Sequence, residues 1–168
     1  GPLNNYADRK TGSFVGLYKS TARKQFVHFP KPQSMGNRED VRWCAITNGQ
    51  ETGLEIVASD AMSTSFLPWS ALQMTLAAHL HELPETDGNF LRLDWQVTGL
   101  GGNSCGQGGP LERDRVMGDR HQMKFIIRPV MKDTDLTSNA KVTTTQECPL
   151  SITRDRAGRV TVTGDNQV

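Results

Sequence analysis

Apolar and polar residues alternate with a period of two along much of this chain. The clearest case is residues 89–97, where apolar side chains are separated by Arg92, Asp94 and Gln96. Successive side chains of a strand point to opposite faces of a sheet, so this pattern predicts a half-buried strand. Similar runs occur at residues 13–18, 24–29, 40–47, 53–59, 62–67 and 121–129. Strands repeated every ~8–12 residues predict an all-β fold, specifically an antiparallel β-sandwich.

Turn-forming residues separate these runs. The chain has 16 glycines and 8 prolines among 168 residues, and its hydrophobic fraction of 36% is low for a globular domain. The pairs Asn48-Gly49 and Ser59-Asp60 lie between predicted strands, where their residue types favour turns. Short strands joined by turns are therefore expected.

One segment has the period of a helix. Within residues 70–81, leucines recur every four positions, Ser70 stands at the N-cap position and Pro84 lies just past the end. These features predict a single short helix. On that helix His79 and His81 would point to different faces, so we do not expect them to form a metal site.

A glycine-rich segment without periodicity follows the strand at 89–97. Residues 99–109 contain six glycines in eleven positions. Glycine lets the backbone approach a ligand closely, and loops longer than ~12–15 residues in a compact domain are often functional. The segment lacks the Gly-Lys-Ser/Thr of a phosphate-binding loop, and Ser104 stands where a dinucleotide fingerprint needs its third glycine. We therefore look here for a different kind of binding site.

Charge and cysteine content exclude several function classes. The formal charge of +1 is too small to attract nucleic acid or anionic lipid by its field, and no run approaches the ~18 apolar residues of a membrane span. We expect no nucleic-acid and no membrane partner. Cys44, Cys105 and Cys148 lie far apart without a C-x-x-C pair, so no metal or cofactor is expected, although one disulfide remains open.

The composition changes beyond residue 131. Residues 132–146 are polar and Thr-rich, which is typical of a linker, and the runs at 151–153 and 159–163 predict a hairpin. We expect a sandwich domain at 1–131, followed at 132–168 by a linker and a hairpin that can open a further domain. Because the chain begins with Gly-Pro-Leu rather than methionine, we expect it to be a fragment.

Three tryptophans could provide flat rings on which sugars stack. Trp43 and Trp95 fall on the apolar phase of predicted strands, so we expect them in the core. Trp69 follows Pro68 at the start of the predicted helix and is the better candidate for an exposed, sugar-binding ring. Hydrolysis of a glycosidic bond needs two suitably spaced carboxylates, and no pair stands out, so no catalytic residue is assigned.

Three segments together resemble a known family. They are GPLNNYADRKTG at residues 1–12, PQSMGNREDVRW at residues 32–43 and GLGGNSC at residues 99–105. With the helix exit at residues 77–83, they are similar in order and spacing to the C-terminal β-sandwich domain of bacterial β-galactosidases of glycoside hydrolase family 2. Asn4 departs from that family's Gly-Pro-x-Glu-Asn-Tyr pattern, which has Glu at this position.

The resemblance implies that this chain is the second half of the family's large sandwich. Strands separated from a larger sheet leave open edges, so a homo-oligomer is one expected assembly. The family's acid/base and nucleophile glutamates belong to a separate barrel domain of the same chain. We therefore expect the barrel as a partner, a galactoside as the substrate of the parent enzyme, and no hydrolysis by this fragment alone.

The resemblance also implies that the glycine loop borders the galactose site. The expected substrate neighbours are Gly102, Asn103, Ser104 and Cys105, with Trp69 as a further candidate. Cys105 stands where the family has a Trp that stacks on the sugar, and a thiol offers much less apolar surface than an indole.

Three functions stay open on these grounds. The first is a non-catalytic domain of a β-galactosidase that hydrolyses terminal β-D-galactosides with retention. The second is an autonomous carbohydrate-binding module, and the third is an architectural domain that mediates subunit contacts. Localisation is open between bacterial cytoplasm and periplasm. Four polar residues are expected to hold loops and strand ends together by hydrogen bonds: Arg9, Asn37, Arg38 and Arg42.

Overall fold

The computed structural model describes residues 1–101, 108–141, 150–154 and 160–164. The chain divides into two compact units, Gly1–Lys132 and Asp133–Val168. Within the described ranges there is no helix long and apolar enough to cross a membrane.

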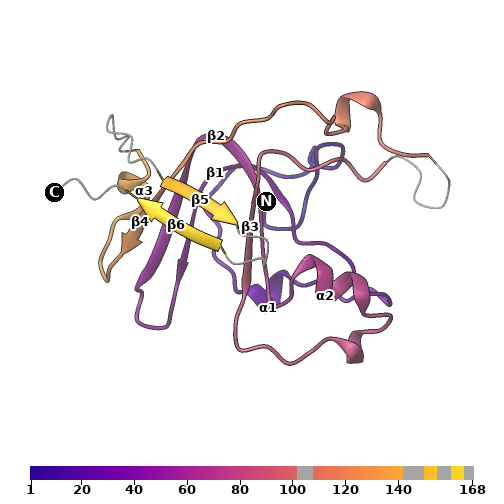
Figure 1. The fold of residues 1–168 in the computed structure, drawn as a ribbon, viewed down its shortest axis with the longest axis horizontal. Coiled ribbons are helices and arrows are strands. Elements are labelled where there is room, and N and C mark those ends of the chain that lie inside the picture. Colours follow the sequence, from indigo (N-terminus) through magenta and orange to yellow (C-terminus); the bar gives the residue numbers. More distant parts are fainter. Residues whose placement is uncertain (102–107, 142–149, 155–159, 165–168) are drawn as a thin grey trace. The chain divides into compact units, whose positions relative to one another are not determined.

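The first unit is built on a four-stranded antiparallel sheet. Its central strand β2 (Gly53–Leu67) is 15 residues long, and β1 (Arg38–Thr47) pairs with it along one edge. Along the other edge, β4 (Phe125–Val130) pairs with the first part of β2 and β3 (Phe90–Asp94) with the last part (Figure 1). The prediction of an antiparallel all-β fold is confirmed.

The β1–β2 hairpin turns where the sequence predicted a turn, at Asn48-Gly49. The Asn48 Oδ1 atom accepts hydrogen bonds from the N–H groups of Gln50 and Thr52, at 2.9 and 3.1 Å. Glu51 takes a positive φ of 61°. The Asn48 side chain thus replaces backbone partners inside the turn and fixes the register of the two strands.

The turn predicted at Ser59-Asp60 is wrong, because β2 continues through it. The irregularity lies in the neighbouring strand instead. In β1 the register shifts on both sides of Val41, and Asp40 has a φ of 59°. The Ser59 N–H still donates to the Lys124 carbonyl at 3.0 Å, so β2 keeps a partner where it passes from β4 to β3.

Two predicted strands do not form. Residues 13–18 have no regular secondary structure, and their large aliphatic and phenyl side chains are 71–76% exposed. Of residues 24–29, the first two belong to a short helix, α1 (Ala22–Gln25), capped by the Thr21 side chain, and the other four have no regular secondary structure. Alternation alone does not make a strand, because its backbone groups also need a neighbouring strand, and no described strand pairs with either segment.

Helix α2 (Ala71–Leu76) begins as predicted, at Ser70. The Ser70 Oγ accepts the Gln73 N–H at 3.1 Å, and the Gln73 Oε1 accepts the Ser70 N–H at 2.8 Å. This reciprocal capping box satisfies two backbone donors at the start of the helix.

The helix ends earlier than predicted. A separate 3₁₀ turn, η1 (Leu80–Glu82), follows it, so one helix over residues 70–81 is wrong. Met74 is the side chain that α2 buries, at 1% exposure, whereas Leu72 and Leu76 are 67% and 75% exposed. Leu72 and Leu76 therefore lie on the face away from the core, whereas Leu80, in η1, packs against the core.

A small apolar core joins α2 to the end of β2. Phe26, Met35, Leu67 and Met74 form it, and Trp69 packs against them. Burying each such side chain contributes about 1.5–3 kcal/mol. This core packs at the end of the sheet next to α2. The β1–β2 turn lies at the opposite end of the sheet.

The second unit contains the predicted hairpin. Strands β5 (Leu150–Arg154) and β6 (Val160–Gly164) pair antiparallel. The segment predicted as a linker, 132–146, includes a short helix, α3 (Leu136–Asn139), whose N-cap is Asp135. The remainder of that segment from residue 142 onward, and the turn at 155–158, lie outside the described residues.

Candidate functional site

The N-terminal segment is fixed to the sheet by two buried asparagines. Asn5 and Asn37 are 2% and 0% exposed. The Asn5 N–H donates to the Asn37 carbonyl at 2.8 Å, and the Asn37 Nδ2 donates to the Asn5 carbonyl at 3.1 Å. The Asn5 Oδ1 also accepts the Glu39 N–H at 2.8 Å, which continues the contact into β1.

The Glu39 carboxylate carries this network into β2. Its Oε1 accepts the Asn37 Nδ2 at 2.6 Å and the Ser63 hydroxyl at 2.9 Å. Buried polar groups of this kind stabilise one arrangement when they are hydrogen-bonded and are costly when they are not. The network therefore fixes the position of the backbone at Asn5, from which the chain continues to Asp8.

Asp8, three residues further along, binds the start of the glycine loop. Its Oδ1 accepts the Leu100 N–H at 3.0 Å and its Oδ2 accepts the Gly101 N–H at 2.7 Å. A Cβ on Gly99 would lie 2.6 Å from the Asp8 carboxyl carbon, so a larger residue at this position would displace the Asp8 side chain. Gly101 also has a φ of +93°, which other residues rarely adopt.

These contacts favour the charged form of Asp8. Burial acts to raise the pKa of the carboxyl, but the N–H groups of Gly101 and Leu100 outweigh it and hold that pKa below its ordinary value. Asp8 is therefore an anion that holds two backbone donors of the loop.

Both ends of the glycine loop meet at this point. The Gly99 N–H donates to the Asp114 carbonyl at 2.7 Å, next to η2 (Glu112–Asp114). A Cβ on Gly101 would lie 2.8 Å from the Gly108 carbonyl oxygen, so the loop leaves and returns at one place. The predicted substrate neighbours Gly102, Asn103, Ser104 and Cys105 lie outside the described residues.

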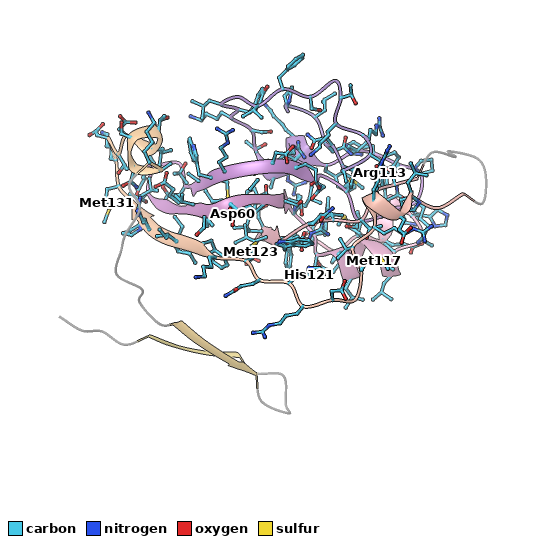
Figure 2. All side chains as sticks on the ribbon, turned by 90° about the horizontal axis from the view of Figure 1, so that it is seen from above. Asp60, Arg113, Met117, His121, Met123 and Met131 are labelled. Carbon is cyan, nitrogen blue, oxygen red and sulfur yellow. The ribbon has the colours of Figure 1, made fainter. Side chains whose placement is uncertain are left out.

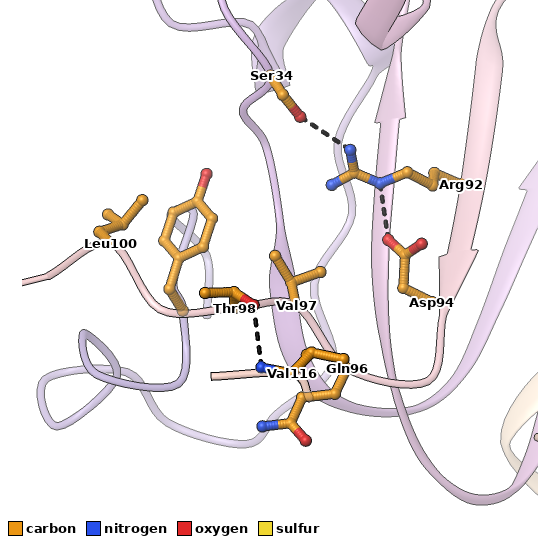
Figure 3. A pocket seen from close by; sticks show the side chains of 9 residues that line it. Ser34, Arg92, Asp94, Gln96, Val97, Thr98, Leu100 and Val116 are labelled. Atoms are coloured by element: carbon orange, nitrogen blue, oxygen red, sulfur yellow. Dashed lines mark hydrogen bonds and ion pairs between the residues drawn. The ribbon is translucent and has the colours of Figure 1, made fainter. Parts of the chain in front are cut away.

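A hollow of about 430 Å³ lies beside the start of the loop (Figure 3). Arg92 spans it, donating from Nη1 to the Ser34 hydroxyl at 2.8 Å while its Nε pairs with the Asp94 carboxylate at 2.7 Å. The Thr98 hydroxyl accepts the Val116 N–H at 3.0 Å. The hollow is lined by Tyr6, Ser34, Arg92, Asp94, Gln96, Val97, Thr98, Leu100 and Val116.

This hollow offers hydroxyl, guanidinium, carboxylate and amide groups, which can all hydrogen-bond to the hydroxyls of a polar ligand. No sequence motif indicated these residues as site residues. The available signal was the polar phase of the 89–97 run, which supplies Arg92, Asp94 and Gln96.

Two tryptophans differ from expectation in their burial. Trp69 is half-buried, its ring lies edge-on to Phe26 at 4.9 Å, and its Nε1 donates to the Pro84 carbonyl at 2.8 Å. Trp95 is 42% exposed rather than in the core, so that prediction is wrong. Because β3 ends at Asp94, the strand period no longer decides where Trp95 points.

The exposed Trp95 ring stacks on His121, with ring centroids 4.2 Å apart and planes 22° apart. His121 belongs to the segment between η2 and β4. Figure 2 shows Met117, His121 and Met123 in succession along the sheet on that path. Trp95 also lines a second hollow of about 270 Å³, beside the Lys10–Asp40 ion pair of 2.7 Å.

Residues 1–127 match the family described as beta galactosidase small chain. The chain belongs to this family. The matched region contains the asparagine network, Asp8 and the whole glycine loop. The resemblance indicated by the three sequence segments is therefore confirmed for the β-galactosidase small-chain domain.

Curated relatives of this small-chain domain are named β-galactosidases. This chain is 36% identical over 107 residues to the β-galactosidase from Priestia megaterium, and the match covers 64% of this chain and 10% of the relative. It is 33% identical over 132 residues to one from Lactobacillus delbrueckii subsp. bulgaricus, covering 78% of this chain and 13% of the relative. The chain thus spans about a tenth of the length of these relatives.

Of the four polar residues expected to hold the small-chain domain together, two have that role in the structure. Asn37 is the buried centre of the network described above. Arg38 donates to the carbonyls of Gly36 and Pro2, the latter at 3.1 Å, and so ties the N-terminus to β1. Arg9 and Arg42 are exposed.

Proposed function

We propose that this chain is the non-catalytic C-terminal domain of a glycoside hydrolase family 2 β-galactosidase, and that its glycine loop borders the galactose site. The parent enzyme hydrolyses terminal β-D-galactosides with two carboxylates held in its barrel domain. The observation that carries the proposal is the Asp8 anchor, which holds the start of the loop at Leu100 and Gly101 beside an open polar hollow. Fixed geometry of this kind is what a substrate-bordering loop needs.

An uncovered apolar face supports a place within a larger protein. Ile127 lies opposite Ile56, and Leu54 opposite Pro129, so these side chains share one face of β2 and β4. Leu54 and Ile127 are each 51% exposed, whereas Ile56 on the same face is buried, at 2% exposure. Packing against the rest of the parent enzyme would cover the exposed pair.

The experiment replaces Asn103, Ser104 and Cys105 with glycine in the full-length protein and measures kcat/KM for a chromogenic β-galactoside. We expect a loss of about tenfold or more, with the melting temperature unchanged, because the loop loses its side chains next to the sugar. Gly88→Ala is the matched control, since its Cβ has no atom within 4 Å. Unchanged kinetics in the loop variant would contradict the proposal.

Experiments on the isolated chain and on its loop variants distinguish two other functions from the proposed one. A carbohydrate-binding module would show saturable amide shifts with galactose or lactose, centred on the loop or on Trp69. The proposed function predicts no shift from a folded chain, because the barrel supplies the rest of the pocket. A purely architectural domain predicts that loop variants change stability or assembly and leave KM unaltered.

A further inference from the structure

A second cluster of polar side chains lies away from the glycine loop, at the turn between α2 and η1. His79, His81 and Glu82 each present one ligand atom, and these atoms lie within 4.8 Å of one another. The helical pattern of residues 70–81 predicted the two histidines on different faces of a helix. His79 instead precedes η1 with extended backbone angles, φ −136° and ψ 160°, and the two imidazole rings stack with centroids 5.4 Å apart.

The carboxylate of this cluster is already oriented. The Glu82 Oε2 accepts the Ala78 N–H at 2.8 Å, and the Glu82 Oε1 lies 2.9 Å from the His79 Nδ1. Hydrogen bonds to the outer oxygen of a ligating carboxylate are a usual supporting feature of metal sites.

The turn itself is held to the core on both sides. Lys31 Nζ donates to the Ala77 carbonyl at 2.9 Å just before the cluster, and the Trp69 indole donates to the Pro84 carbonyl at 2.8 Å just after it. Leu80 and Leu83 pack against the apolar core. The backbone of the cluster is therefore fixed, and its three side chains are exposed.

We propose that His79, His81 and Glu82 bind a divalent transition-metal ion of the Zn²⁺ class, with water completing the coordination. Two imidazoles and one carboxylate suit Zn²⁺, whose ligand atoms lie at about 2.0–2.2 Å and so about 3.3–3.5 Å from one another. Side-chain rotation can bring atoms within 4.8 Å to that spacing. Mg²⁺ and Ca²⁺ prefer all-oxygen sites and are not expected to bind here. The inference is independent of the proposed function.

The test is calorimetric titration of Zn²⁺ into the full chain without a histidine tag. One equivalent is expected to bind, with affinity lowered at least about tenfold in His81→Gln and in Glu82→Gln. His121→Gln is the matched control, because this histidine lies outside the cluster, and it should bind as the parent chain does. Circular dichroism checks that each variant is folded, and both substitutions are at exposed positions.

Mg²⁺ serves as the second probe and should give no saturable heat. The proposal is overturned if Zn²⁺ shows no saturable binding up to about 1 mM. It is equally overturned if folded His81→Gln binds Zn²⁺ as tightly as the parent chain, since the ion would then be held elsewhere.

Discussion

The Asp8 carboxylate and the Gly101 N–H are 93 positions apart in the chain, and they form a hydrogen bond of 2.7 Å. The same carboxylate accepts the Leu100 N–H at 3.0 Å. One side chain near the N-terminus therefore determines where the glycine loop of this β-galactosidase small-chain domain begins. The buried Asn5–Asn37 contact a few residues earlier keeps Asp8 in place.

Replacing Asp8 by Asn should loosen the start of the loop. The amide has one acceptor oxygen in place of two, so one N–H group of the loop loses its partner. A hydrogen bond to a charged group is worth about 1.5–3 kcal/mol, and exposure of Asp8 reduces this to about 1 kcal/mol. Hydrogen exchange of the Leu100 and Gly101 amides should accelerate about fivefold. Asp87→Asn, at an exposed position, is the control.

The anchor should also respond to acid. The folded-state pKa of Asp8 is depressed, so its contribution is fully present above the ordinary value of 3.8 and is lost as the pH falls through the lower folded value. The Gly101 amide resonance, followed from neutral pH downward, should therefore shift below about pH 3.8. A shift centred near neutral pH would contradict this assignment.

Gly53→Ala should disrupt the β1–β2 hairpin. A Cβ at Gly53 would lie 1.9 Å from the Ile46 carbonyl oxygen, so the backbone of one strand must move. We expect a loss of about 3 kcal/mol in the free energy of unfolding, measured by urea denaturation. Gly49→Ala, in the same hairpin, has no atom within 4 Å of its Cβ and should change stability by less than about 1 kcal/mol. Equal losses in the two variants would be inconsistent with the steric explanation.

Cys44 in β1 should be slow to react. Burial, followed by the nearby Glu55, raises the pKa of its thiol from 9.0 to about 11. The thiolate is the reactive form, so alkylation at pH 8 should be about a hundredfold slower in the folded chain than in urea. Peptide mass spectrometry gives the rate for Cys44 alone, and equal rates in the two states would rule out the raised pKa.

The same raised pKa predicts a loss of stability in alkali. The contribution of the Cys44 thiol is fully present below about pH 9 and is lost as the pH rises through about 11. Urea denaturation across this range should show a decline that Cys44→Ser reduces.

Local pattern predicted those parts of the fold that local interactions decide. The alternation at residues 40–47 and 121–129 indicated β1 and β4, and Ser70 and Asn48 indicated a helix start and a turn. Each of these depends on neighbours within a few positions of the chain or on a repeated burial pattern.

The features that were missed depend on distant parts of the chain. Residues 13–18 alternate like a strand, but no described strand lies beside them. β2 passes through Ser59-Asp60, where its neighbour along one edge changes from β4 to β3. The glycine content of residues 99–109 pointed to a special loop, but only the fold shows that Asp8 holds it and that Arg92 and Asp94 line the adjoining hollow. Trp95 lies one position beyond the end of β3, where the strand period ends.

The decisive experiment on the Asp8 anchor compares Asp8→Asn with Asp87→Asn in the full-length protein. It measures kcat and KM for a β-galactoside and the melting temperature of each variant. If the loop held by Asp8 borders the galactose site, Asp8→Asn lowers kcat/KM about fivefold or more while its melting temperature stays close to that of Asp87→Asn. Identical kinetic constants in the two variants, with faster exchange at Gly101 in Asp8→Asn, would show that the loop has no part in the site.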